Sequence, residues 1–495
     1  MSSVLITNCG QLLTLRGEAP RRGQALRDPG LVRDGAVLVR DGRIAAVGAR
    51  RIVERAWKRL PAKERRATRE LDAGGRVALP GFVDSHTHLI HAASRAEEYE
   101  LRIAGATYQE IARAGGGIAS SVKKARAATI AELKERALGH LHQFAAHGTT
   151  TMEAKSGYGL DLVSELKILW LHRQLQGDPT RGLPFRRRSA PKVRGGTPRN
   201  LLSQPSLVEE GQVSRPASIG TRDDKPHPWA GKKPRGAAPV ATGPSAPWEA
   251  APVDIVSTFL GAHVLPPEFR KRPDAYVDLL IRRMLPQVAV EGLAQYCDVF
   301  CDAGAFTLAQ ARRILTAARA CGLGLRLHAE QLTHTGAARL GVELHAASVD
   351  HLEQITGTDI RALAASDTTC TLLPGCCFHL GLQHYAPARA LIDAGAIVAL
   401  ATDFNPGTSP TLSMPMILSL ACTQMRMTPA EAVAAATINA AYSLGRSHRI
   451  GSLEVGKYAD LALFDVQDYR EIPYYFGVNH CALTLKRGEV VWNHG

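Results

Sequence analysis

The sequence contains no long hydrophobic run, no recognisable signal peptide and no regular cysteine pattern. Among its 495 residues, no apolar stretch approaches the roughly 18 to 20 residues that a membrane helix requires. The first segment, MSSVLITNCGQLLTL, lacks a basic region followed by an apolar core and a cleavage site. The nine cysteines match no common zinc or redox spacing, which indicates free thiols in a reducing compartment. We therefore expect a cytoplasmic protein that has no membrane partner.

The basic residues are unevenly distributed along the chain. The net charge of +14 would favour an anionic partner such as nucleic acid. However, residues 177–249 hold 13 Lys and Arg against 6 Asp and Glu, which is half of the net charge. The remainder of the chain is only moderately basic, so we expect no nucleic-acid partner.

The same segment differs from the rest of the chain in composition. It carries 12 of the 28 prolines and shows neither a helical nor a strand period of apolar residues. Such a composition cannot bury enough apolar surface to offset the entropy lost on ordering. We predict a disordered or loosely attached insert over residues 177–250. One alternative is that the segment is a basic tether for RNA or a membrane surface. Another is that it is absent from the working protein.

Outside the insert, short apolar strands alternate with helical stretches rich in Ala, Leu and charged residues. About eight such strands lie between Val77 and Ala401, and no GxGxxG motif follows the first. This pattern is typical of a parallel sheet wrapped by helices, and the strand count favours a (β/α)8 TIM-like barrel in the α/β class. Both ends of the chain instead alternate apolar and polar residues around Asp-Gly and Arg-Gly turns. We predict a barrel over residues 80–448 and a small β-sandwich formed by residues 1–79 and 449–495.

Several predicted strands end in histidine or aspartate. His86 and His88 follow the first barrel strand, and because residues i and i+2 share a face of a strand, both can face one point. Later strands end in His328, His351 and Asp403, and barrel active sites are built from the carboxyl ends of the strands. Imidazole and carboxylate groups are ligands for zinc and similar ions, so these positions predict a metal site. The alternative for the His86 and His88 pair alone is two ordinary surface histidines.

These motifs resemble those of a known superfamily. PGFVDSHTHL, LHAEQ, VDHLE and ATDFNPGTSP look like the amidohydrolases. Within them, SRAEEYELRIAGATYQEIARAGGGI, EAKSGYGL, STFLGAH and TLLPG closely resemble the imidazolonepropionase family. The resemblance covers the chain from about residue 35 to its end, apart from the insert.

The resemblance implies a role for individual residues. One zinc or iron ion per subunit would be held by His86, His88, His328 and Asp403. The catalytic positions match His351, Asp403 and Gln331. At the position of Gln331 some relatives have Glu and others Gln, and a glutamine can only hydrogen-bond. The positions that would contact the substrate match Arg95, Tyr158, His263, Gln331, Asn405, Gly407 and Thr408. For Arg95, a surface ion pair with Glu97 or Glu98 is the alternative.

The implied reaction is metal-dependent hydrolysis of 4-imidazolone-5-propanoate to N-formimidoyl-L-glutamate, in histidine catabolism. A guanidinium such as that of Arg95 suits capture of the propanoate carboxylate. The alternatives are a related amidohydrolase that acts on another heterocycle and a barrel scaffold without catalytic activity. By analogy with other barrel hydrolases, a homodimer is expected.

Overall fold

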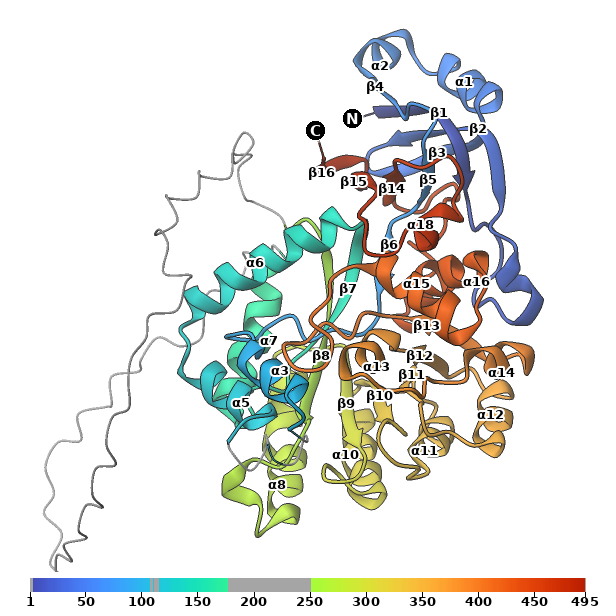
Figure 1. Ribbon diagram of the computed structural model, residues 1–495. Helices are drawn as coiled ribbons and strands as arrows, with labels where there is room; N and C mark the ends of the chain where they lie inside the picture. The colour runs from blue at the N-terminus through green and yellow to red at the C-terminus, as the bar shows by residue number, and fades with distance from the viewer. Residues whose placement is uncertain (1–2, 107–109, 111–114, 177–250, 495) are drawn as a thin grey trace, which may run out of the picture. The chain divides into compact units, whose positions relative to one another are not determined.

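The computed structural model describes residues 3–106, 110, 115–176 and 251–494, and its central feature is a parallel β-barrel (Figure 1). Neighbouring strands of the barrel are paired in chain order from β6 to β13. The strands are β6 Phe82–Asp84, β7 Thr149–Lys155, β8 Asp254–Ala262, β9 Tyr296–Cys301, β10 Gly324–Ala329, β11 Ser348–His351, β12 Thr369–Leu372 and β13 Ile397–Leu400. The predicted eight-stranded α/β barrel is thus confirmed. The insert predicted at 177–250 lies outside the described residues.

Helices follow the barrel strands and cover them on the outside (Figure 1). They are α3 Ala96–Ile103, α5 Ile118–Ala127, α6 Ile130–Ala146, α7 Leu162–Leu175, α8 Pro273–Leu279, α9 Leu285–Val290, α10 Leu308–Ala320, α11 Ala337–Glu343, α12 Gly357–Ala364, α13 Pro374–Leu380, α14 Ala388–Asp393, α15 Met414–Met425, α16 Pro429–Ala434 and α17 Ala440–Ser443. Thr129 with Glu132 forms a capping box at the start of α6. Such a box satisfies backbone N–H groups that the first turn of a helix leaves without partners.

The barrel closes between its first and last strands just beyond their carboxyl ends. Thr87 and Phe404 form a parallel bridge there. Two backbone hydrogen bonds flank the bridge, from Asp403 N to His86 O at 3.0 Å and from His88 N to Phe404 O at 2.8 Å. The segments that close the barrel are therefore those that carry three of the predicted metal ligands.

Strands from both ends of the chain form a second, eight-stranded sheet, in which blue and red strands lie side by side in Figure 1. Its strands are β1 Ser3–Leu13, β2 Leu31–Arg40, β3 Arg43–Ala49, β4 Arg69–Asp72, β5 Val77–Pro80, β14 Leu461–Phe464, β15 Cys481–Lys486 and β16 Glu489–Asn493. The helices α1 Arg50–Lys58, α2 Ala62–Ala67 and α18 Glu471–Tyr474 accompany it. The predicted small β-sandwich is confirmed as a domain built by both termini, whose eight strands the structure joins in one sheet.

The run GRVALPGFVDSH spans the change from one sheet to the other. Its first half is β5 of the terminal sheet and its second half is β6 of the barrel. Gly81 separates them, and a Cβ atom at this position would lie 2.3 Å from Cγ2 of Thr150. The chain can therefore pass this close to β7 only at a glycine. The exact division at residues 79/80 and 448/449 stays a prediction.

None of the described helices combines the length and the apolar character needed to cross a membrane.

Candidate active site

The four predicted metal ligands converge at the carboxyl end of the barrel. The potential donor atoms of His86, His88 and His328 lie within 4.8 Å of one another. Oδ1 of Asp403 lies 3.5 Å from Nε2 of His86 and 3.6 Å from Nε2 of His88. All four side chains are buried. Residues that are far apart in the sequence thus present three nitrogens and one carboxylate oxygen to one point.

The histidines are arranged to present free nitrogens to that point. Nδ1 of His86 lies 2.7 Å from Oδ2 of Asp350, and Nε2 of the same ring is buried without a hydrogen-bond partner. In the same way, Nδ1 of His328 lies 3.1 Å from Oδ1 of Asp298. Burial, with smaller effects of neighbouring charges, lowers the pKa of His86 and of His88 well below the usual value. Neutral imidazoles held by carboxylates on their far side are typical metal ligands, so the donor set fits a divalent cation.

A buried lysine joins the two carboxylates that hold these histidines. Nζ of Lys155 lies 2.6 Å from Oδ2 of Asp298, 2.7 Å from Oε1 of Glu153 and 3.6 Å from Oδ2 of Asp350. Burial lowers the pKa of Lys155, but the three carboxylates outweigh burial and raise it. Lys155 does not line the cavity described below. Its ammonium group instead supports the partners of His86 and His328.

His351 and Asp403 lie beside the donor cluster. Nitrogen atoms of His86 and His351 and an oxygen of Asp403 all lie within 4.8 Å of one another. The backbone of His351 has a φ of 82° and that of Asp403 a φ of 54°, values that non-glycine residues rarely adopt and that often occur at functional sites. Burial, opposed mainly by His351, raises the pKa of the Asp403 carboxyl to about 6. A basic carboxylate beside a histidine can accept and return a proton.

A cavity of about 410 Å³ opens in front of these residues. Of the predicted substrate-binding residues, the structure places Arg95, Tyr158, His263, Gln331, Asn405 and Thr408 in its wall. Gly407 is not among the lining residues, but it lies against Arg95, since a Cβ atom at this position would be 2.0 Å from Nη1 of Arg95. Oδ1 of Asn405 accepts hydrogen bonds from the backbone N–H groups of Gly407 and Thr408, at 2.8 Å and 2.7 Å. His91 stacks on His140 and is not among the residues that line the cavity.

Arg95 forms an ion pair with Glu98, as the alternative hypothesis suggested. Nη2 and Nε of Arg95 lie 2.5 Å and 2.8 Å from Oε2 of Glu98. The pair does not lie on the surface, however, because its side chains are only 10% and 16% exposed. Arg95 therefore belongs both to an ion pair and to the cavity wall.

Comparisons with known proteins agree with this geometry. Models of the amidohydrolase family match residues 69–162 and 300–491. The chain is 43% identical to an imidazolonepropionase from Solibacter usitatus, with 99% of each chain covered. It is 41% identical to an imidazolonepropionase from Geobacillus kaustophilus, with 100% of this chain and 99% of that protein covered.

The chain belongs to the imidazolonepropionase family. It is accordingly an amidohydrolase, an enzyme that acts on a small molecule. The family and the donor cluster together imply a divalent metal ion.

Solved structures show the same fold at much lower identity. A zinc-bound adenosine deaminase from Xanthomonas campestris is 17% identical, with 99% of this chain and 92% of that chain covered and a TM-score of 0.60. Guanine deaminase from E. coli is 13% identical over the whole of both chains, with a TM-score of 0.61.

Some residues of this imidazolonepropionase-family site were not predicted from the sequence. No role was predicted for Asp298, which lies inside β9, or for Asp350, which precedes His351 in the VDHLE motif, because neither is the last residue of its strand. Arg102 also lines the cavity, and its spacing of seven residues from Arg95 on a helical segment was the available signal. The apolar and aromatic lining is formed by Ile118, Phe300, Leu332, Leu380 and Leu382.

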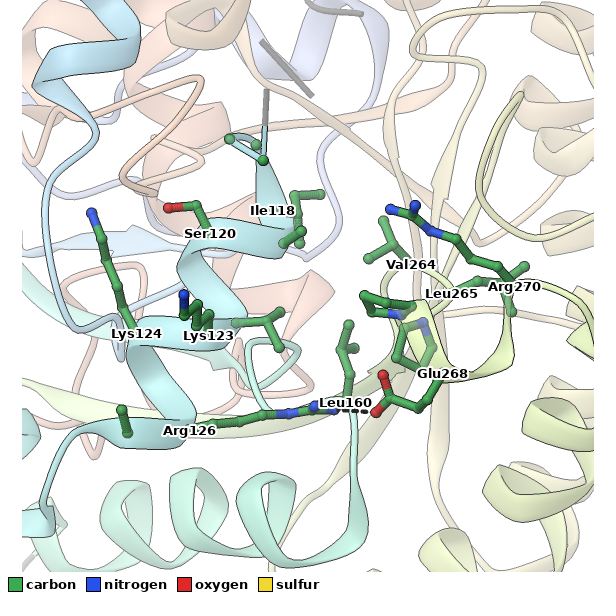
Figure 2. Close-up of a pocket in the computed structure, with 18 of the residues that line it drawn as sticks. Ile118, Ser120, Lys123, Lys124, Arg126, Leu160, Val264, Leu265, Glu268 and Arg270 are labelled. Atoms are coloured by element: carbon green, nitrogen blue, oxygen red, sulfur yellow. Dashed lines mark hydrogen bonds and ion pairs between the residues drawn. The ribbon is translucent and has the colours of Figure 1, made fainter. Parts of the chain in front are cut away.

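A second, larger hollow of about 1350 Å³ lies beside the family site, and Ile118 lines both. Figure 2 shows Arg126 extended toward Glu268 across this hollow, where Nη2 lies 3.0 Å from Oε1. Lys123, Lys124 and Arg270 add positive charge to its lining. The neighbourhood of the active-site cavity is thus basic, which suits an anionic substrate.

Proposed function

We propose that the chain hydrolyses 4-imidazolone-5-propanoate to N-formimidoyl-L-glutamate, a step of histidine catabolism. The observation that carries this proposal is the pairing of a metal-binding cluster with a basic cavity wall in a chain of the imidazolonepropionase family. In the reaction, a water oxygen bonds to the ring carbonyl carbon and the bond from that carbon to the ring nitrogen breaks. The nitrogen takes up a proton, and the former carbonyl becomes a carboxylate.

The ligands of a zinc or iron ion, one per subunit, would be His86, His88, His328 and Asp403. When bound, such an ion lowers the pKa of its water from 15.7 to about 7 and polarises a carbonyl oxygen. Asp350 and Asp298 would keep the Nε2 atoms of His86 and His328 directed at the ion, because they occupy the Nδ1 atoms.

Asp403 would move the proton. Its carboxylate would accept a proton from the attacking water and deliver it to the leaving ring nitrogen, a role that the raised pKa supports. His351 would orient the water and stabilise negative charge on the carbonyl oxygen. Its Nδ1 lies 3.6 Å from Oε1 of Glu353, which leaves Nε2 for this task.

The remaining wall residues would hold the substrate. Arg95 would bind the propanoate carboxylate, and Tyr158, His263 and Gln331 would contact the ring. Asn405, Gly407 and Thr408 would shape the loop beside the propanoate. Gln331 cannot transfer protons, so its amide would only hydrogen-bond.

Two further properties belong to this proposal. The protein would work in the cytoplasm as a homodimer. Tyr474, Tyr475, Phe476 and Val478 form an exposed apolar surface that a second copy of the chain would cover. Light scattering of the purified protein would give twice the chain mass for a dimer.

Isotope labelling tests the proposed reaction. The protein is incubated with 4-imidazolone-5-propanoate in water enriched in oxygen-18, and the product is analysed by mass spectrometry. The proposal predicts N-formimidoyl-L-glutamate with one labelled oxygen, located in the α-carboxylate. Unchanged substrate in the presence of folded, metal-loaded protein would contradict it.

A further inference from the structure

Two arginines, one just before helix α3 and one near its end, line the active-site cavity. Arg95 precedes the first residue of α3, and Arg102 is the residue before its last. Because seven residues span about two turns of an α-helix, the two side chains leave the same face. Both arginines line the cavity together with Asn405 and Thr408.

The charge of Arg95 is already balanced in the structure. Its Nε and Nη2 atoms both donate to Oε2 of Glu98. The same Glu98 oxygen accepts a hydrogen bond of 3.0 Å from the backbone N–H of Gly117, which fixes its position. Arg95 and Glu98 together carry no net charge, so this pair offers hydrogen-bond donors to an anion but little net attraction.

Arg102 has no carboxylate partner among the described residues. Its Nη1 and Nη2 atoms donate long hydrogen bonds to the carbonyl oxygens of Gly407, at 3.4 Å, and His379, at 3.3 Å. Its Cζ lies 5.4 Å from the centre of the Tyr99 ring. Burial and the nearby charge of Arg95 lower the pKa of Arg102. An arginine remains charged at neutral pH even so. An anion in the cavity would compensate for the hydration that burial removes from Arg102.

We propose that Arg102 is a specificity-determining residue, which supplies the uncompensated positive charge that attracts and holds the carboxylate of the substrate. Arg95, held by Glu98, would orient that carboxylate, and Arg102 would provide most of the net electrostatic attraction. This inference rests on the proposed function, since it concerns the propanoate group of that substrate. The carboxylate is present before and after ring opening, so the interaction should act on binding more than on the chemical step.

Three variants test the inference. Arg102→Met removes the charge and keeps an unbranched side chain, and Arg102→Lys keeps the charge without the planar fork. Lys134→Met removes an exposed positive charge from α6, outside the cavity wall, and is the matched control. Thermal unfolding establishes that each variant is folded.

The first readout is steady-state kinetics with 4-imidazolone-5-propanoate. We expect Arg102→Met to raise KM roughly tenfold to a hundredfold, the range of one charge-assisted hydrogen bond, with kcat little changed. Arg102→Lys should recover part of the loss, and Lys134→Met should behave as the wild type. An unchanged KM in Arg102→Met, or a fall in kcat alone, would overturn the inference.

The second readout is calorimetric binding of imidazole-4-propanoate and of its neutral amide. The variant Arg102→Met should weaken binding of the carboxylate and leave binding of the amide as in the wild type. Equal losses for both ligands would contradict a role in carboxylate recognition. If wild-type protein binds these ligands but hydrolyses no 4-imidazolone-5-propanoate, the proposed function fails, and the comparison of the two ligands still decides the role of Arg102.

Discussion

At the scale of single residues, the site depends on which nitrogen each histidine presents. Strand periodicity was sufficient to predict that His86 and His88 share a face and that His328 and Asp403 end other strands. It could not predict Asp298 and Asp350, because their contacts depend on how β9, β10 and β11 are aligned side by side. In that alignment His328 is paired with Asp350 across the sheet, and Asp298 comes from the strand on the other side.

The contact between Asp298 and His328 leads to a prediction about metal affinity. Replacing Asp298 with Asn removes a charged acceptor from His328 and a partner from Lys155. Loss of such a supporting carboxylate typically weakens metal binding about 10- to 100-fold. Competition with a chelator, followed by measurement of the metal retained per subunit, gives the affinity directly.

The variant Asp367→Asn serves as the control, because the Asp367 side chain is 87% exposed and, among the residues that the structure describes, forms an ion pair with Arg22 alone. It should retain metal as the wild type does. Equal retention by Asp298→Asn and the wild type would show that the carboxylate does not support the ligand.

At the scale of secondary-structure elements, most strands could be predicted because each is a short apolar run bounded by turn residues. The helix α10 likewise begins at a capping box of Thr307 and Gln310 that is visible in the sequence. A domain boundary was predicted inside this run, at residues 79/80, but the break at Gly81 that separates β5 from β6 could not be predicted. It depends on the approach of Gly81 to Thr150, which is a contact between distant parts of the chain.

Helix α16 leads to a prediction about pH. Glu431 accepts a hydrogen bond from the backbone N–H of Thr428 and forms ion pairs of 2.9 Å with Arg389 and 3.0 Å with Arg27. Burial raises the pKa of Glu431, but these partners outweigh burial and lower the pKa to about 2. Because the folded pKa lies below the usual 4.5, the carboxylate stabilises the fold above pH 4.5, and this contribution declines as the pH falls toward 2.

Urea unfolding of the wild type and of Glu431→Gln between pH 7 and pH 3 measures this contribution. The variant should have the lower free energy of unfolding at pH 7, and the difference should shrink below pH 4.5. A difference that stays constant, or grows as the pH falls, would contradict the assignment.

At the scale of the whole molecule, the segments that carry His86, His88 and Asp403 both close the barrel and contribute to the active site. The insert predicted at residues 177–250 interrupts the chain between α7 and β8. The side chain of Gln176 donates a hydrogen bond to the carbonyl oxygen of Ile255, so the two flanks of the insert are neighbours. Every described residue of the site lies outside that segment.

We therefore expect that replacing residues 177–250 with a short Gly-Ser linker preserves kcat/KM, because closing a shorter loop between adjacent ends costs little. A chain in which the same residues are scrambled provides the comparison. Loss of activity in both altered chains, with unchanged thermal unfolding, would show that the segment contributes specific contacts to the reaction.

The central claim is that this cluster of three histidines and one aspartate performs metal-dependent opening of an imidazolone ring. The most direct measurement is the ultraviolet absorbance of freshly prepared 4-imidazolone-5-propanoate during incubation with the protein, before and after removal of metal by a chelator. We predict that the substrate band disappears with untreated protein, persists after metal removal, and disappears again after zinc or iron is restored. Loss of the band at the same rate in the metal-free protein, or its persistence with folded and metal-loaded protein, would contradict the claim.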